Sequence, residues 1–252
     1  MRLFDTHCHL TEEPLASDLR GVLARAREAG VEEVLVPASG RASWGAVTAM
    51  RDLPGVHTAI GLHPWFAQEG VDKVELEDVL ARHSCVAIGE IGLDLAVDSP
   101  PADVQIRVLE TQLSVACDMD LPVLLHCRKA FTELTDVLKS YLPGLRGLLH
   151  AFSRSPEVAE PFLEAGFYIA FGGAVTRPGA ARARASAVHV PPERLLLETD
   201  APSIGLDGIH ARDVEPRHVR DVAAAVASLR GTTPEAVAGL TTANARRLFR
   251  LE

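Results

Sequence analysis

The chain has 252 residues, of which 47% are hydrophobic and 23% charged, so it can bury a large core and does not have the composition of a disordered protein. Its formal net charge of −9 argues against a protein that binds nucleic acid over a broad basic face. An anionic substrate would have to be held locally, and bound metal ions can supply the positive charge.

Apolar segments of strand length alternate with amphipathic helical segments along the whole chain, without a linker or a low-complexity segment. The expected strands are residues 2–6, 33–37, 56–61, 86–90, 123–126, 147–150, 167–171 and 195–198. Helical patterns lie between them, for example at 15–29, 102–116 and 131–142, and three more follow the last strand at 215–229, 234–240 and 241–249. We expect an α/β fold, a TIM-type (β/α)8 barrel forming a single domain over residues 1–252, with the last helices on its outer wall.

Metal-ligating residue types recur where the expected strands end. Two of them follow the first strand, and the others end or follow the fourth, fifth, sixth and eighth strands: they are His7, His9, Glu90, His126, His150 and Asp200. In a barrel the carboxyl ends of all strands meet at one face, where active sites are built. An H-x-H pair alone is a weak signal, but six such residues at strand ends favour a metal centre over coincidence.

Six ligands, one of them a carboxylate that can bridge, predict two divalent cations about 3.5 to 4 Å apart. We expect one ion to be bound by His7, His9 and Asp200, the other by His126 and His150, and both by Glu90. Mg, Mn and Zn are candidates, although imidazole ligands suit Zn, Mn or Fe better than Mg. A water held between two ions loses a proton more easily, and Asp200 could receive that proton as a general base.

Several residues near the expected ligands are candidates for substrate contacts. His63 follows the third strand and could donate to a phosphate oxygen or a leaving group, or serve only the structure. Arg128 and Arg154 follow ligands and could clamp a phosphate, or simply face solvent. Trp65 and its neighbour Phe66 could stack on a base or pack on the barrel rim. Three arginines within 177–184 could guide a nucleic acid strand or lie on a solvated helix face.

Six sequence motifs resemble those of the TatD family of metal-dependent deoxyribonucleases, within the amidohydrolase-like superfamily. They are FDTHCHL at 4–10, IGLHPW at 60–65, GEIGLD at 89–94, LPVLLHCR at 121–128, HAFS at 150–153 and LLLETDAP at 195–202. The resemblance spans nearly the whole chain and implies a TIM-type barrel, the same six metal ligands, and 3′-to-5′ exonuclease or related activity on DNA.

The chain departs from the family pattern around the ligands and keeps the ligands themselves. Leu95 stands after GLD, where the family usually has an aromatic residue, and Arg154 replaces a glycine after HAFS. The loop at 203–216 lacks the aromatic residue and the basic, Asn-Glu-Pro-containing sequence common after ETDAP. These departures bear on the substrate more than on the hydrolysis.

The sequence therefore predicts a metal-dependent phosphodiesterase, with DNA or another phosphodiester as substrate. The same site could instead hydrolyse an ester or amide, such as the ester of an aminoacyl-tRNA, since an activated water does not itself choose phosphorus over carbon. A barrel stabilised by metal without turnover is a further alternative. No obligate protein partner is evident, and the absence of an apolar segment of about 20 residues or of a signal-like N-terminus leads us to expect a soluble, cytoplasmic protein.

Overall fold

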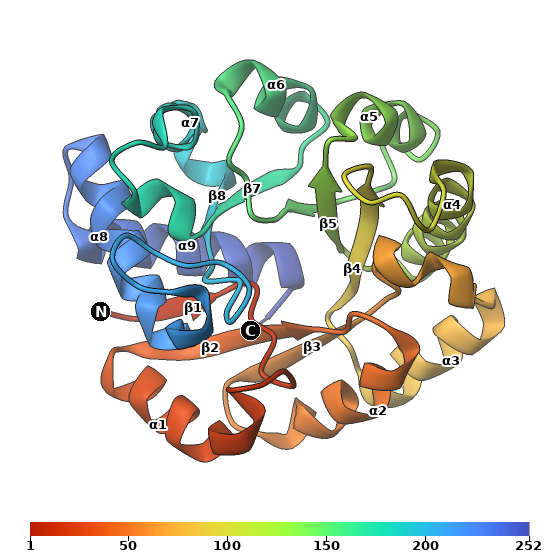
Figure 1. Ribbon diagram of the computed structural model, residues 1–252, viewed down its shortest axis with the longest axis horizontal. Helices are drawn as coiled ribbons and strands as arrows, with labels where there is room; N and C mark the ends of the chain where they lie inside the picture. Colours follow the sequence, from red (N-terminus) through yellow and green to blue (C-terminus); the bar gives the residue numbers. More distant parts are fainter. Residues whose placement is uncertain (252) are drawn as a thin grey trace.

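Eight parallel strands form the centre of the structure, and helices surround them (Figure 1). The computed structural model describes residues 1–251. The strands are β1 (Leu3–Asp5), β2 (Val31–Pro37), β3 (Val56–Ile60), β4 (Ala87–Asp94), β5 (Val123–Arg128), β6 (Gly147–Leu149), β7 (Tyr168–Phe171) and β8 (Leu195–Leu197). They pair in sequence order, each parallel to the next. The predicted TIM-type barrel is confirmed, and β4 and β5 run farther toward the site than expected.

The outer helices alternate with the strands and lie around the barrel. They are α1 (Leu19–Glu28), α2 (Arg41–Ala49), α3 (Lys73–His83), α4 (Ala102–Met119), α5 (Phe131–Lys139), α6 (Pro156–Glu164), α7 (Ala181–His189) and α8 (Val219–Arg230). The helical pattern at 15–29 begins later than expected, because residues 16–18 form a 3₁₀ turn before α1. Within residues 1–251, none of the helices has the length and apolar character needed to cross a bilayer.

The barrel closes between β8 and β1 through a few hydrogen bonds beyond the ends of these short strands. The amide of Thr6 donates to the carbonyl of Leu197 at 3.1 Å, and the amide of Asp200 donates to the carbonyl of His7 at 2.9 Å. Side chains reinforce this seam, since the buried Asp5 carboxylate accepts from both the amide and the hydroxyl of Thr199, at 2.9 and 2.6 Å. The seam thereby holds the first and last site segments side by side.

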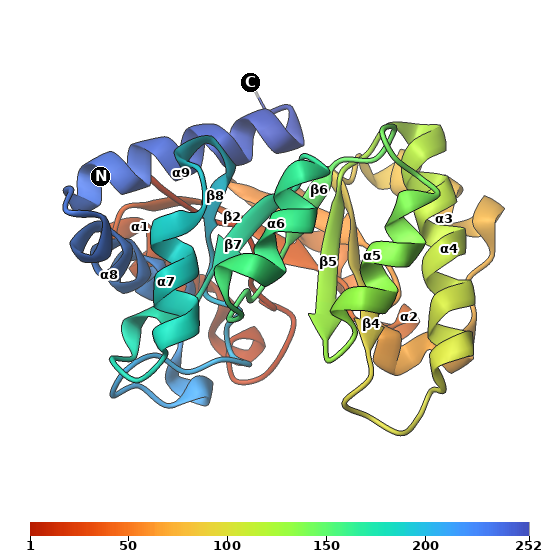
Figure 2. The same ribbon diagram turned by 90° about the horizontal axis from the view of Figure 1, so that it is seen from above.

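The last helix, α9 (Pro234–Phe249), lies across the amino-terminal end of the barrel (Figure 2). Its Ala245, Leu248 and Phe249 belong to the same apolar cluster as interior strand residues, and the ring of Phe249 lies 6.0 Å from that of Phe4. The expectation that residues 234–240 and 241–249 form separate helices on the outer wall was therefore wrong. Thr241 does not interrupt the helix, because its hydroxyl donates to the carbonyl of Val237 at 2.9 Å.

An ion-pair network ties α9 to the neighbouring strands. Glu33 on β2 accepts from Arg246 of α9 at 2.8 Å and lies 2.9 Å from Nε2 of His57 on β3. Burial raises the pKa of Glu33, but the hydrogen bonds with His57 and Arg246 outweigh burial, so the pKa lies below its ordinary value. The ionised carboxylate of Glu33 thus stabilises the packing of α9 against the amino-terminal end of the barrel.

Candidate metal centre

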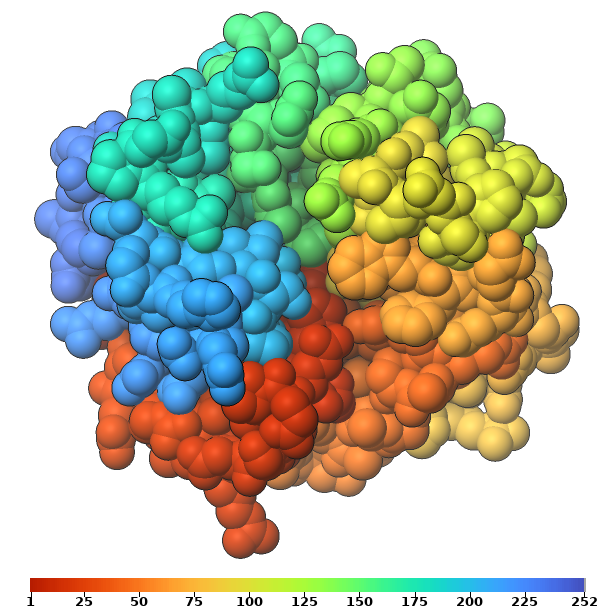
Figure 3. All heavy atoms as spheres, viewed as in Figure 1, coloured from red at the N-terminus to blue at the C-terminus, as the bar shows by residue number. Residues whose placement is uncertain are grey.

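The opposite face, formed by the carboxyl ends of the strands, is hollowed near its centre (Figure 3). The cavity there has a volume of about 170 Å³. Its lining includes five of the six predicted ligands together with His63 and Trp65, while His7 lies fully buried beneath it. The predicted site residues therefore meet at the end of the barrel where active sites are expected.

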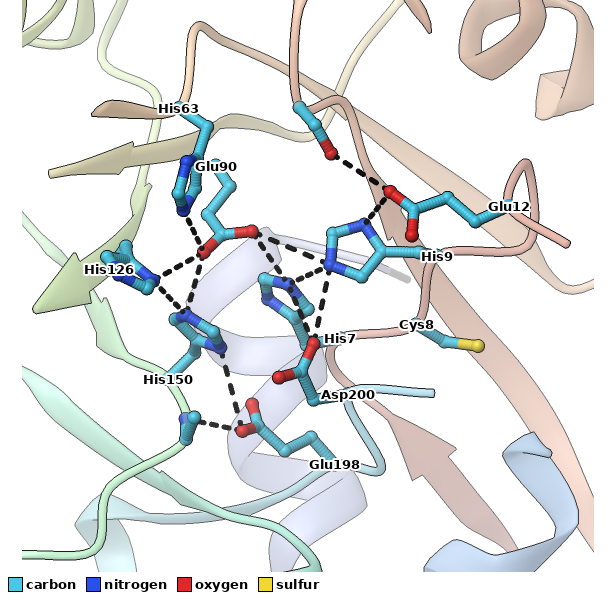
Figure 4. Close-up of polar contacts among 12 residues, drawn as sticks. His7, Cys8, His9, Glu12, His63, Glu90, His126, His150, Glu198 and Asp200 are labelled. Atoms are coloured by element: carbon cyan, nitrogen blue, oxygen red, sulfur yellow. Dashed lines mark hydrogen bonds and ion pairs between the residues drawn. The ribbon is translucent and has the colours of Figure 1, made fainter. Parts of the chain in front are cut away.

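Glu90 lies between two pairs of imidazoles (Figure 4). Its Oε2 is 3.2 Å from Nε2 of His7 and 3.6 Å from Nε2 of His9. Its Oε1 is 2.8 Å from Nε2 of His150 and 2.9 Å from Nδ1 of His126. Each oxygen of this carboxylate therefore faces a different pair of nitrogens, which is the arrangement expected of a bridging ligand.

Asp200 completes the cluster beside His9. One of its carboxylate oxygens lies 3.3 Å from Nε2 of His9 and 3.8 Å from Nε2 of His7. The backbone of Asp200 has a φ of 53°, a left-handed conformation that Asp tolerates better than most residues. The thiol of Cys8, between the two histidines, points away from the cluster, as the alternation of an extended segment requires (Figure 4).

Three overlapping groups of side chains bring enough donor atoms together to hold a cation. They are His7, His9 and Glu90; His63, Glu90 and His126; and His7, His150 and Asp200. The overlap at His7 and at Glu90 makes this one continuous cluster. His7 also stacks on His150, with ring centroids 4.1 Å apart, so the geometry alone does not divide the histidines into two separate sets.

The spacing of the imidazole nitrogens fits a shared cation. Nε2 of His7 lies 3.2 Å from Nε2 of His9, and Nδ1 of His126 lies 3.2 Å from Nε2 of His150. Two nitrogens bound at about 2.1 Å by one tetrahedral ion lie about 3.4 Å apart. The donor set of four imidazoles and two carboxylates therefore fits divalent cations.

The protonation states of the clustered side chains also favour the binding of cations. Burial raises the pKa of Glu90, but neighbouring imidazoles, His150 first, outweigh it and hold the carboxyl ionised. Burial and the nearby His150 lower the pKa of His7 to about 4, so its ring is neutral and its lone pair is available. Burial would lower the pKa of His9 as well, but Asp200 and Glu90 raise it to about 9. Buried carboxylates thus attract positive charge, which protons or metal ions can provide.

His63 lies against this cluster on the side opposite Asp200. Its Nδ1 accepts a hydrogen bond from the amide of Trp65 at 3.1 Å, at the start of the 3₁₀ helix η3 (Pro64–Glu69). A neutral His63 therefore carries its proton on Nε2, which lies 3.4 Å from Oε1 of Glu90. This tautomer directs an N–H group into the cavity, where it can donate to an oxygen.

Asp94 is a site residue that the sequence reasoning missed. It is fully buried at the end of β4, and its Oδ2 lies 3.4 Å from Nε2 of His126 and accepts from the indole N–H of Trp65 at 2.7 Å. A carboxylate behind a metal-binding imidazole fixes the orientation and tautomer of the ring. Its position at the end of the GEIGLD motif is the sequence feature that could have identified Asp94 as a site residue.

Glu198 is a buried carboxyl group beside His150 that the sequence reasoning also missed. Its Oε1 accepts from the amide of Ala151 and lies 3.8 Å from Nδ1 of His150, while its Oε2 is buried without a partner in the described chain. Burial, and then the charge of Asp200, raise the pKa of this carboxyl well above its ordinary value. The ETD sequence in the last strand motif was the signal that could have identified it.

Arg128 and Arg154 line a second pocket that adjoins His150. This pocket has a volume of about 270 Å³ and is also lined by Lys129. Arg128 exposes 58% of its side chain and lies 3.8 Å from Asp94, while the guanidinium of Arg154 lies over the ring of Phe131 at 5.7 Å. The structure thus places three basic side chains beside the cluster of candidate metal ligands.

The arginines of 177–184 are mostly engaged in holding loops. Arg177 donates to the carbonyl of Gly205, and Arg184 donates to the carbonyl of Val175 at 3.0 Å. Each of these two arginines therefore contacts a loop carbonyl, whereas Arg182 is exposed on α7.

Comparison with known proteins supports the chemistry of the cluster. The model of a family described as TatD related DNase matches residues 4–250. A Bacillus subtilis protein named an uncharacterized metal-dependent hydrolase, YabD, is 35% identical over 256 residues, which cover 99% of both chains. The 3′-5′ ssDNA/RNA exonuclease TatD of Erwinia billingiae is 35% identical over 260 residues, again 99% of both chains. The crystal structure of YjjV, a TatD homologue from Escherichia coli, matches with a TM-score of 0.93 and 35% identity over 100% of this chain and 99% of that one.

Proposed function

Because the chain belongs to the TatD-related DNase family and is a metal-dependent hydrolase, we propose that it hydrolyses phosphodiester bonds of DNA, as a 3′-to-5′ exonuclease. The observation that carries this proposal is the placement of Glu90, whose two oxygens face separate pairs of imidazoles. That arrangement suits a two-cation site of the kind used to displace an oxygen from phosphorus.

The proposed site holds two divalent cations, Mg, Mn or Zn. One would be held by His7, His9 and Asp200, the other by His126 and His150, with Glu90 shared by both. When bound, such ions neutralise the charge of the phosphodiester and make a water more acidic. The contact of Asp200 with His9 supports the first set, and the contact between His126 and His150 supports the second.

Asp200 and His63 act on the attacking and the leaving oxygen, respectively: Asp200 accepts a proton and His63 donates a hydrogen bond. The oxygen of water forms a bond to phosphorus while its proton passes to the carboxylate of Asp200, and the bond from phosphorus to the leaving oxygen breaks. The Nε2–H group of His63 donates a hydrogen bond to that leaving oxygen and stabilises its negative charge, and the leaving oxygen then takes a proton from the carboxyl group of Asp200 or from solvent. Both side chains line the same cavity, and the acceptor hydrogen bond at Nδ1 of His63 keeps its proton on the side of the cluster.

Arg128 and Arg154 are proposed to contact phosphate. The chain has a net charge of −9, so attraction of a polyanion has to come from a local patch. These two arginines line the pocket next to His150, and Arg154 has no carboxylate partner within residues 1–251. Their guanidinium groups can therefore form two hydrogen bonds each with phosphate oxygens.

The test uses metal-stripped protein reloaded with Mg, Mn or Zn and offered single-stranded DNA, duplex DNA, RNA, bis(p-nitrophenyl) phosphate and an aminoacyl ester. We expect turnover of single-stranded DNA from the 3′ end. Hydrolysis of the ester with no turnover of any phosphodiester would overturn the proposal in favour of carbonyl chemistry. The variant Asp200→Asn, checked for retained metal by elemental analysis, should lose turnover, and unchanged activity would refute its role as proton acceptor.

A further inference from the structure

Trp65 is the largest exposed apolar side chain at the mouth of the barrel. It exposes 51% of its surface and lines the cavity of Glu90 and Asp200. Its indole N–H donates at 2.7 Å to Asp94, whose side chain is fully buried. A large ring that is fixed at one edge by a buried carboxylate, yet open to solvent, has the properties of a binding surface.

Trp65 and the adjacent Phe66 form an aromatic rim at the cavity, and neighbouring groups hold both rings in place. The ring of Trp65 meets His63 edge to face, with centroids 4.7 Å apart. Phe66 is 37% exposed and lies over Gly40, where a Cβ atom would come within 3.0 Å of the phenyl ring. Gly40 therefore leaves space that Phe66 occupies. These contacts restrict both aromatic rings before any ligand arrives, which lowers the entropy lost on binding.

Packing alone does not account for this arrangement. The indole of Trp65 fixes its polar edge against a buried carboxylate and leaves half of its surface exposed, which is the combination expected of a ring that presents a face to a ligand. Other large exposed apolar residues in the described chain are Met1, Phe66, Val74 and Val188. Trp65 and Phe66, the two aromatic residues among these five, are neighbours on one rim, at the cavity lined by the predicted metal ligands.

We propose that Trp65 stacks on the nucleobase of the terminal nucleotide whose phosphodiester lies in the metal site. This inference rests on the proposed function and narrows it, because it requires a substrate with a planar base and not merely a phosphodiester. Stacking tolerates every base, since each has a π face, so the rim favours base-bearing ends without selecting a sequence.

Asp94 fixes the position of this platform relative to the chemistry. The same Oδ2 atom that accepts from Trp65 lies 3.4 Å from Nε2 of His126. A base stacked on the indole is thereby held at a set distance from a candidate metal ligand. Asp94 acts as a positioning residue for both, and Trp65 touches the substrate.

Kinetics on matched substrates test the stacking. Single-stranded oligonucleotides would carry either a natural or an abasic 3′-terminal nucleotide. Trp65→Ala should raise KM for the natural end on the order of tenfold, equivalent to about 1.4 kcal/mol. It should change KM for the abasic end much less. The control Val188→Ala removes methyl groups from a side chain with the same exposed fraction, 51%, on α7, away from the cavity lining. An equal loss on both substrates for Trp65→Ala would overturn the inference.

Intrinsic fluorescence gives a readout that does not depend on turnover. The chain has two tryptophans, and the other, Trp44, is only 7% exposed and donates to the carbonyl of Gly61 at 2.8 Å. Deoxyadenosine monophosphate should quench the emission, deoxyribose 5-phosphate should not, and the variant Trp65→Phe should lose the quenching. Quenching that persists in Trp65→Phe, or that does not require the base, would refute the stacking.

The two proposals can fail separately. Hydrolysis of DNA that is indifferent to the terminal base would refute stacking and leave the phosphodiesterase intact. Base-dependent quenching without turnover of any phosphodiester would refute the phosphodiesterase and support Trp65 as a base-binding surface.

Discussion

Replacing Thr199 with valine removes one hydroxyl from the seam that closes the barrel. That hydroxyl donates to Asp5 at 2.6 Å and accepts from the amide of Ala201 at 3.2 Å. Both Asp5 and Thr199 are fully buried, so water does not replace the lost contacts. Valine keeps the volume of threonine closely, and the change therefore isolates the hydrogen bonds.

The expected cost is about 2 kcal/mol, because a buried polar group left without its partner loses about 1 to 3 kcal/mol. For a chain of this length that corresponds to a drop in Tm of about 4 to 8 °C. The seam also sets the positions of His7 and Asp200, through the hydrogen bond from the Asp200 amide to the His7 carbonyl at 2.9 Å. We therefore expect metal affinity to fall together with stability.

Differential scanning calorimetry of Thr199→Val measures the change directly. The matched control is Thr242→Val, the same substitution at a half-buried residue whose hydroxyl makes an exposed hydrogen bond to the carbonyl of Arg2 at 3.2 Å. The control should change the free energy of unfolding by less than about 0.5 kcal/mol. If the two variants have the same Tm, the hydrogen bond between Asp5 and the Thr199 hydroxyl does not stabilise the barrel, and the reasoning is wrong.

Three further changes test other parts of the structure. Glu33→Gln should cost about 1 kcal/mol at neutral pH. Because folding lowers the pKa of Glu33, its contribution to stability is present above the ordinary pKa of 4.5 and is lost as the pH falls below that value. The Tm values of wild type and variant should therefore converge in acid. A difference in Tm that stays constant with pH would contradict this. Lys129→Ala should reduce the slope of log affinity for single-stranded DNA against log salt by about 0.7, whereas Lys139→Ala, which removes the same charge at the far end of α5, should leave the slope unchanged. Asp94→Asn should weaken metal binding by roughly 10- to 100-fold in equilibrium dialysis, and a loss no greater than that of Asp103→Asn, an exposed acid on α4, would exclude a role behind His126.

The barrel and its ligand cluster could be predicted because both follow from the one-dimensional order of the chain. Parallel strands joined by crossover helices bring all carboxyl ends to one face, so residues such as Glu90 and His150 meet wherever the strands are correctly identified. The period-two alternation around Cys8 likewise fixes the common direction of His7 and His9.

Contacts between elements distant in sequence could not be predicted in the same way. The place of Asp94 behind His126 depends on β4 continuing four residues past Glu90, after an irregularity in its register with β5. Helix α9 has an amphipathic pattern that suits either an outer wall or a floor, and only the open end of the barrel decides between them. Arg177 and Arg184 contact backbone carbonyls of loops, and such contacts cannot be recognised from side-chain patterns.

The position of α9 has a consequence for biosynthesis. Strands β1 to β8 are all translated before residue 234, so the catalytic mouth can assemble while the opposite end of the barrel still presents Phe4 and its apolar neighbours to water. Only when Leu248 and Phe249 leave the ribosome does that opening receive its cover. A ribosome that stalls before α9 has emerged would carry a nascent barrel whose amino-terminal end exposes apolar side chains, and chaperones bind surfaces of this kind.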